Sequence, residues 1–276
     1  MKISEKSLGF FICTPCTLNC KLCGNCVPLF RQEKNHYFVP LETYQREITE
    51  AFKIFDYVEV ISITGGEPLL HNQLGDMVAY TLENFQTKFG EFRITTNGTM
   101  LPAPSLMQAI RTYAHENVLF VIDDYGSVSN KITEITQVLN ENHVPYRINH
   151  YHGEDQHCGG WIDFGPLDVR RNYSEKEAQS IVDRCHAAQW RCVNIFKGKL
   201  HLCGHATCGV ELGSFTLGPD EYVDLFDNSQ PLEKKKEIVA TLGKKPIEAC
   251  YYCNGFDPET AERFPAGEQI GEQNHD

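Results

Sequence analysis

Three cysteines stand close together near the start of the chain, in the segment Cys16-Thr17-Leu18-Asn19-Cys20-Lys21-Leu22-Cys23. A short apolar run precedes them, so we expect a loop that follows a strand to carry all three thiols. A loop with this CxxxCxxC spacing can wrap three thiolates around one corner of an iron–sulfur cluster. A [4Fe–4S] cluster usually takes four Cys ligands, so one iron would stay open to another ligand. The alternative is a structural zinc site that borrows a fourth ligand such as Cys26.

Composition narrows the classes of function. The 276 residues suit one or two domains, and the net charge of -12 argues against binding to nucleic acid or an anionic membrane. There is no apolar run long enough to span a membrane, and residues 1–6 lack the apolar core of a signal peptide. The 12 cysteines therefore point to metal or redox chemistry in a reducing compartment. We expect a cytoplasmic protein.

Apolar strands alternate with helical patterns through the first part of the chain, which predicts an α/β fold built from right-handed βαβ units and a parallel sheet. The expected helices cover roughly residues 41–55, 73–88, 105–114 and 131–140. The expected strands are 8–13, 57–63, 92–96, 118–122 and 144–149, with 161–164 as a sixth. Six such strands predict a partial (β/α)6 barrel over residues 1–165.

The pattern changes after Pro166. A helix is expected at 175–186, and the stretches 192–196 and 199–203 flank Lys197-Gly198 as a β-hairpin would. Another helix is expected at 233–241. We therefore predict a small C-terminal domain, a β-hairpin plus helix, over residues 166–260, and a loose tail over 261–276.

Polar motifs follow three of the expected strands. Gly65-Gly66-Glu67-Pro68 ends the second strand, Thr96-Asn97-Gly98 ends the third, and Asp123 and Asp124 end the fourth. The carboxyl ends of parallel strands share one edge of a sheet, where such folds bind ligands. Each motif could also be a plain turn. Their common placement favours one shared active site.

The CxxxCxxC loop, the Gly-Gly-Glu-Pro motif and Thr96-Asn97-Gly98 together resemble the radical S-adenosylmethionine (radical SAM) superfamily. The resemblance implies a [4Fe–4S] cluster on Cys16, Cys20 and Cys23, with S-adenosyl-L-methionine (SAM) on the open iron. It also implies reductive cleavage of SAM to a 5′-deoxyadenosyl radical, with electrons from a donor such as flavodoxin or ferredoxin.

The resemblance assigns further residues to the SAM site. By it, Gly65, Gly66 and Glu67 approach the amino acid part of SAM, and Asn97 lies near SAM. Leu22 stands where the family usually has an aromatic residue, so it would pack on the adenine without stacking.

Several polar residues are candidates for substrate chemistry. Asp123 and Asp124 suit the hydroxyl or amino groups of a polar substrate, or they cap a solvated turn. Arg147 lies in an expected strand and could bind a carboxylate, orient a substrate or act as the base. The alternative for Arg147 is an edge or surface position. A cluster of His150, His152 and His157 follows that strand, and one of them could accept a proton.

A second set of cysteines lies in the C-terminal region: Cys185, Cys192, Cys203, Cys208, Cys250 and Cys253. The spacing resembles the twitch domain of radical SAM enzymes, a shortened SPASM domain that holds one auxiliary [4Fe–4S] cluster. The resemblance implies the ligands Cys185, Cys203, Cys250 and Cys253, although Cys192 or Cys208 could replace one of them. A zinc site in the same thiols is the alternative.

Size and cysteine layout are similar to those of the aminocyclitol dehydrogenases (2-deoxy-scyllo-inosamine type) of butirosin-type antibiotic biosynthesis. We therefore expect a radical SAM enzyme that oxidises an alcohol of a small sugar-like or aminocyclitol-like substrate to a ketone. The first alternative is an epimerase, with a surplus thiol as hydrogen donor among Cys13, Cys26, Cys158, Cys192 and Cys208. Peptide modification ranks lower, because only about seven residues precede the first expected strand. A non-enzymatic zinc or iron–sulfur protein is the alternative from another class.

Overall fold

A computed structural model describes residues 2–113 and 117–271 of the chain. Its centre is an 8-stranded sheet with the strand order β5-β4-β3-β2-β1-β6-β7-β8. The neighbours from β5 through β1 to β6 run parallel, and β7 and β8 join them antiparallel. The strands are β1 (Ser4–Phe11), β2 (Tyr57–Thr64), β3 (Phe89–Thr96), β4 (Val118–Asp124), β5 (Tyr146–His150), β6 (Cys192–Phe196), β7 (Lys199–His201) and β8 (Val223–Asp224).

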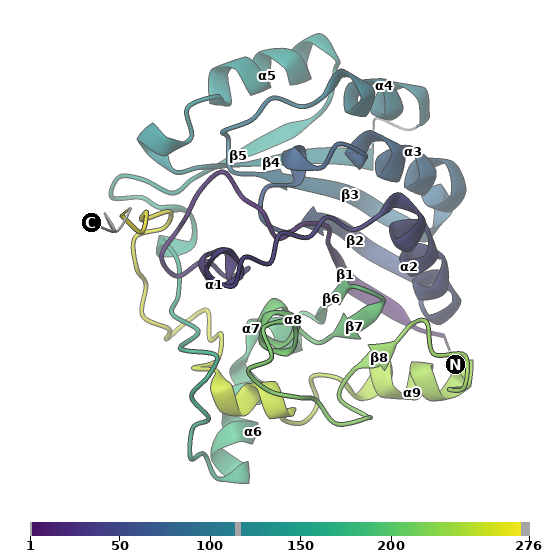
Figure 1. Cartoon of the computed structure of the whole chain (residues 1–276), viewed down its shortest axis with the longest axis vertical. Coiled ribbons are helices and arrows are strands. Elements are labelled where there is room, and N and C mark those ends of the chain that lie inside the picture. The colour runs from purple at the N-terminus through teal and green to yellow at the C-terminus, as the bar shows by residue number, and fades with distance from the viewer. Residues whose placement is uncertain (1, 114–116, 272–276) are drawn as a thin grey trace.

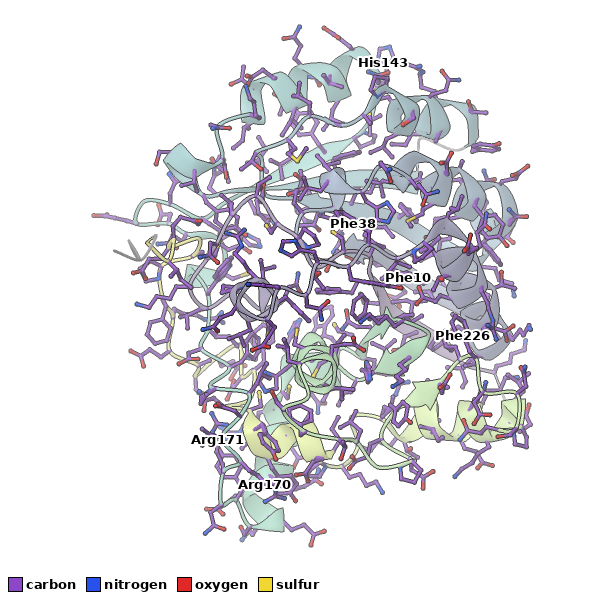
Figure 2. The ribbon with its side chains drawn as sticks, viewed as in Figure 1. Phe10, Phe38, His143, Arg170, Arg171 and Phe226 are labelled. Carbon is purple, nitrogen blue, oxygen red and sulfur yellow. The ribbon has the colours of Figure 1, made fainter. Side chains whose placement is uncertain are left out.

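Four helices connect the first five strands and lie along one side of the sheet (Figure 1). They are α2 (Leu41–Ile54), α3 (Leu74–Phe85), α4 (Pro104–Tyr113) and α5 (Ile132–Glu141). Each has an apolar stripe at helical spacing that is buried against the sheet. Phe10 of β1, labelled in Figure 2, is fully buried and meets the ring of Tyr44 from α2 edge-on at 5.1 Å. The α/β fold with a largely parallel sheet is confirmed.

The sixth parallel strand differs from the expected one. Residues 161–164 form no strand of the sheet, and Trp161 makes only an isolated bridge to Phe264. The position beside β1 is taken by β6, the first strand of the predicted hairpin, which pairs Leu8 with Val193. The apolar run at 161–164 is too short and too near a turn to specify its partner. The C-terminal region therefore continues the barrel sheet across the predicted domain boundary near residue 165.

The β6–β7 hairpin itself has the expected form. Asn194 pairs with His201, and the turn residues Lys197 and Gly198 both have positive φ angles of 50° and 75°. The second strand is shorter than expected, because the chain leaves it at His201 and Cys203 caps the next helix. The helices after β5 are α6 (Glu175–Arg184), α7 (His186–Gln189), α8 (Gly204–Glu211) and α9 (Leu232–Thr241).

Two helices have weak signals in the sequence. Helix α1 (Val27–Gln32) is short, and its first residue follows Cys26 in a left-handed conformation. Helix α8 contains Gly204 and Gly209, which lower helix propensity. Packing compensates in α8, since a Cβ added at Gly209 would lie 2.1 Å from the ring of Phe215. Close contact with that ring, and not local propensity, explains this helix.

Within residues 2–113 and 117–271, no helix has the length and apolar character needed to cross a membrane.

Candidate active site

The loop after β1 carries Cys16, Cys20 and Cys23, all as free thiols. Burial raises the pKa of Cys16 to about 11 and that of Cys23 to about 12. Burial likewise raises the pKa of Cys20. Without a cation these thiols keep their protons, and a metal that binds thiolates displaces them. The three side chains border one cavity.

Nitrogen donors approach two of these sulfur atoms. The Asn97 side-chain amide donates to Cys16 Sγ at 3.3 Å, and the Leu18 N–H donates to the same sulfur at 3.4 Å. The Gln269 amide donates to Cys20 Sγ at 3.1 Å. Hydrogen bonds to cysteine sulfur are one of the features by which proteins tune iron–sulfur clusters. Asn97, directly after β3, is therefore placed beside the cysteine loop, and its predicted contact with SAM stays a prediction.

The turn after β2 packs directly on the cysteine loop. A Cβ added at Gly65 would lie 2.5 Å from the carbonyl oxygen of Cys13, and one at Gly66 would lie 1.9 Å from that of Pro15. The Gly66 N–H donates to the Cys13 carbonyl at 2.7 Å. Both positions need glycine because two backbone segments meet there. Gly65 and Gly66 also line the cavity.

Glu67 is fully buried and ties this turn to the end of β3. Its two carboxylate oxygens accept from the Leu69 N–H at 3.0 Å and from the Asn97 N–H at 2.8 Å. Burial raises its pKa to about 7. The cavity wall contains Gly66 and Pro68 but not Glu67. A contact between Glu67 and the SAM ammonium stays a prediction, and the observed partners of its carboxylate are the two backbone N–H groups and the Thr96 side chain.

The cavity between these loops has a volume of about 230 Å³ and opens at the carboxyl ends of the parallel strands. Cysteine thiols border one part of it, and polar and aromatic side chains border the rest. Its walls include Cys16, Cys20, Cys23, Asn25, Gly65, Gly66, Thr95, Asn97, Asp123, Tyr125 and Trp161. A concave site with a few convergent polar groups is the usual form of a small-molecule site.

The two aspartates at the end of β4 have different surroundings. Asp123 lines the cavity, accepts from the Asn149 amide at 2.9 Å and from the Tyr125 hydroxyl at 3.4 Å. Desolvation in this wall raises the pKa of Asp123 to about 6. Successive side chains of a strand point to opposite faces. Asp124 accordingly does not line the cavity, and it accepts hydrogen bonds from His150 and His152.

Two other predicted residues lie outside the cavity wall. Arg147 is exposed on the edge strand β5, donates to the Asn149 Oδ1 atom at 3.2 Å, and lowers the pKa of Asp123 through its charge. Leu22 has a positive φ of 57° and borders a separate pocket beside Phe164. The structure therefore gives Arg147 an indirect place beside Asp123, and the adenine contact of Leu22 stays a prediction.

The second thiol set gathers Cys185, Cys203, Cys250 and Cys253. Burial is the largest cause that raises the pKa of Cys203. Electrostatic repulsion from the other three thiols of the set raises it further. Burial likewise raises the pKa of Cys253, and repulsion from Cys185 and Cys250 adds to this effect. The Gly255 N–H donates to Cys253 Sγ at 3.3 Å. Cys203 thus has the other three thiols named by the resemblance among the groups that raise its pKa, and a shared cluster on them stays a prediction.

The two possible substitutes have other neighbours. Two causes raise the pKa of the fully buried Cys208. The larger is a hydrogen bond with Cys26, and the second is burial. Burial and the charge of Glu5 raise the pKa of Cys192. Among the four thiols of the second set, only Cys185 contributes to this shift. Their positions favour neither as a replacement for one of the four thiols.

The chain end does not form a loose tail through residue 271. Ile270 donates to the Asn19 carbonyl at 2.8 Å, and the Lys21 N–H donates to Glu268 at 2.7 Å. Gly267 packs against Tyr125, where an added Cβ would lie 2.6 Å from the ring. These contacts join the chain end to the cysteine loop and to the cavity wall. Residues 272–276 lie outside the described part.

Sequence reasoning missed several residues of this site, among them Tyr125, Trp161 and Gln269. Tyr125 directly follows the two aspartates, so its position at a strand end was a usable signal. Trp161 and Gln269 reach the cavity and the cysteine loop through long-range contacts only. No local pattern in the sequence predicts the position of Trp161 or Gln269.

Replacement of Gln269 by alanine should loosen the cysteine loop without abolishing cluster binding. The change removes the donor to Cys20 Sγ and the acceptor of the Asn19 N–H, which lies 2.8 Å away. At about 0.5–1.5 kcal/mol for each hydrogen bond, we expect a loss of about 1–3 kcal/mol in unfolding free energy. We also expect a lower reduction potential of the bound cluster. Denaturant unfolding and redox titration measure the two effects, with Gln32→Ala, an exposed site, as control. Unchanged stability and potential would contradict the assigned contacts.

Comparison with known proteins supports the same interpretation. Residues 11–133, less than half of the chain, match the family model described as the Radical SAM superfamily. No curated protein matches the chain. The crystal structure of BtrN in complex with AdoMet and 2-DOIA aligns over 96% of this chain and 99% of its own, with 15% identity and a TM-score of 0.54. The structure of a histidine-tagged anSMEcpe with bound AdoMet aligns over 98% of this chain and 93% of its own, with 11% identity and a TM-score of 0.53.

At such low identities the two structures establish likeness of fold alone. The family model begins at the last residue of β1. It includes the cysteine loop, the Gly-Gly-Glu-Pro turn and the Asn97 turn. These are the segments that meet around the cavity. Residues 11–133 are thus similar to the Radical SAM superfamily, and the whole chain resembles the two solved structures in fold.

Proposed function

We propose that this chain is a radical SAM oxidoreductase that oxidises a secondary alcohol of a small polar substrate to a ketone. The observation that carries this proposal is the cavity of about 230 Å³, which has three thiols on its border and the carboxyl group of Asp123 in its wall. Its walls offer hydrogen bonds to hydroxyl or amino groups.

The residues present fit the cofactors that the family implies. Cys16, Cys20 and Cys23 would hold a [4Fe–4S] cluster, and Gly65, Gly66 and Asn97 would border SAM. When bound, the cluster and SAM supply a 5′-deoxyadenosyl radical that takes a hydrogen atom from carbon.

We propose a cluster over a single zinc ion because residues 11–133, which contain Cys16, Cys20 and Cys23, match the Radical SAM superfamily model. Measurement of zinc, iron and sulfide in the protein tests this choice against the non-enzymatic zinc alternative.

Asp123 is the best-placed proton acceptor. Oxidation of an alcohol to a ketone removes one hydrogen atom from carbon, one proton from the hydroxyl group and one electron. Asp123 lines the cavity, and its raised pKa of about 6 keeps it ionised but basic near neutral pH. Arg147 donates hydrogen bonds and offers no acceptor, so its role is to orient Asn149 and to stabilise the charge of Asp123.

The electron needs an acceptor, and we assign that role to a second [4Fe–4S] cluster. Cys185, Cys203, Cys250 and Cys253 would be its ligands, because each is an electrostatic neighbour of the others. Four thiolates would leave this cluster without an open iron, which suits electron transfer. A flavodoxin or ferredoxin is the proposed reductant for SAM cleavage.

The epimerase alternative needs a thiol that returns a hydrogen atom to carbon. In the described part of the chain, the cavity wall contains no cysteine beyond Cys16, Cys20 and Cys23. Cys13 and Cys208 are buried elsewhere, and Cys158 is exposed. These positions favour dehydrogenation over epimerisation. Peptide modification remains the second alternative, because the structure of anSMEcpe with bound AdoMet and Cp18Cys peptide shares the fold over 98% of this chain, with 11% identity and a TM-score of 0.53.

The test is product analysis with the reconstituted enzyme in deuterated water, using a panel of polyols, aminocyclitols and amino sugars. We expect a ketone in amounts equal to the 5′-deoxyadenosine formed. A product with inverted configuration and deuterium on carbon would support epimerisation instead. If SAM is cleaved only in the presence of peptides, the small-molecule proposal is wrong.

A further inference from the structure

A second group of metal-binding side chains lies outside the SAM cavity. Asp124 Oδ2, His150 Nδ1 and His152 Nε2 all lie within 4.8 Å of one another. They are the only three such ligand atoms of different residues that meet this limit among the described His, Cys, Asp and Glu side chains. Imidazole and carboxylate are common ligands of divalent transition metals.

The sheet itself brings these residues together. In the register of β4 and β5, Asp124 pairs directly with His150, so their side chains share one face. His152 lies two residues further and returns to the same side of the chain. The Tyr151 N–H donates to the Asp124 carbonyl at 2.7 Å, which fixes the backbone between the two histidines.

The distances suit one bound ion. Each of the two histidine nitrogens lies 2.9 Å from Asp124 Oδ2. Two ligands about 2.1 Å from one metal ion are about 3.0–3.4 Å apart at angles of 90–109°. The imidazole–carboxylate distances therefore need little change to accept an ion. The histidine side chains are 61% and 50% exposed, so an ion can reach them.

The carboxylate is already oriented and charged. The Gly126 N–H donates to Asp124 Oδ1 at 2.9 Å, which leaves Oδ2 for the histidines. Although burial opposes ionisation, hydrogen bonds from His152, Gly126 and His150 hold the pKa of Asp124 below its ordinary value. Such support of a ligand by a second hydrogen bond is typical of metal sites.

We propose that Asp124, His150 and His152 bind one divalent transition-metal ion, with further coordination positions open to water. The ion would fix the chain that follows β5. That chain carries Tyr151, whose ring stacks on Tyr125 at 5.3 Å, and Tyr125 in turn meets Trp161 at 5.4 Å. Tyr125 and Trp161 both line the SAM cavity. The metal would therefore order the aromatic wall of that cavity from outside.

The test is equilibrium dialysis of the anaerobically reconstituted protein against Zn²⁺, followed by measurement of zinc and iron per chain. Reconstitution occupies the cysteine sites, so the difference between variants reports the histidine site. We compare the wild type with His150→Ala/His152→Ala and with His157→Ala, a control in the same segment outside the triad. The wild type and the control should each retain about one zinc more than the double variant, with equal iron in all three.

A second variant separates metal binding from misfolding. Asp124→Asn keeps the shape and the hydrogen-bond acceptor but lowers the negative charge, so it should weaken Zn²⁺ binding without loss of iron. In the wild type, Zn²⁺ should raise the thermal unfolding midpoint, and in the double variant it should not. Equal zinc in the wild type and the double variant would overturn the proposal, and the hydrogen-bonded triad would then be structural only.

Discussion

Replacement of Asp123 by asparagine is expected to lower the rate of product formation by about 10²–10⁴-fold, the usual contribution of a general base. Asparagine has the same shape and can still accept from Asn149, but it holds no proton-accepting carboxylate. Binding of SAM and cleavage to 5′-deoxyadenosine should continue, because Asp123 is not a predicted ligand of either group. The measurement is the ratio of ketone to 5′-deoxyadenosine under anaerobic turnover. Asp155→Asn, at an exposed position, is the control.

The pH profile adds a second criterion. Because desolvation raises the pKa of Asp123 to about 6, the ionised acceptor forms as the pH rises through that value. The kcat of the wild type should therefore increase between about pH 5 and pH 7, and Asp123→Asn should lack this limb. If the same limb persists in the variant at full rate, another group, such as one of the histidines after β5, is the base.

Replacement of Gly66 by alanine is expected to destroy the SAM site. The added methyl group would lie 1.9 Å from the Pro15 carbonyl oxygen and 2.8 Å from that of Thr14, so the cysteine loop would have to move. Overpacking of this kind costs about 1–3 kcal/mol even where neighbours can shift, and here the neighbours are backbone atoms. We expect loss of SAM cleavage, a lower thermal midpoint and about half the iron of the wild type.

Gly218→Ala provides the matched control for Gly66→Ala. The nearest atoms to an added Cβ at Gly218 belong to the Glu221 side chain at 3.6 Å, an ordinary contact. This variant should keep the iron content and SAM cleavage of the wild type. If Gly66→Ala behaves like this control, the close approach between the Gly-Gly turn and the cysteine loop is not required for the site.

The residues that local patterns could predict are those at strand ends. Hydrophobic alternation located β2, β3 and β4, and the parallel arrangement then placed Gly66, Asn97 and Asp123 at one edge of the sheet. Their convergence in the cavity follows from this rule. The same rule placed Asp124 beside Asp123 in the predicted site. In the structure only Asp123 lines the cavity, because successive side chains of a strand point to opposite faces.

Long-range pairing accounts for what the sequence could not predict. The pairing of β6 with β1 joins residues far apart in the chain, and the strand at 192–196 looks the same whether it starts a separate hairpin or extends a sheet. The placement of Gln269 on Cys20 depends on tertiary contacts of the chain end in the same way. The metal triad depends on the register of β4 and β5, which a single sequence leaves open.

The two-cluster account is tested most directly by iron and acid-labile sulfide per chain after anaerobic reconstitution. The samples are the wild type, Cys16/Cys20/Cys23→Ala, and Cys185/Cys203/Cys250/Cys253→Ala. Two [4Fe–4S] clusters predict about eight iron atoms in the wild type and about four in each variant, with matching sulfide. About four iron atoms in the wild type and none in the first variant would mean that the C-terminal thiols hold no cluster. The proposed route for the electron, and with it the assignment as a dehydrogenase, would then be wrong.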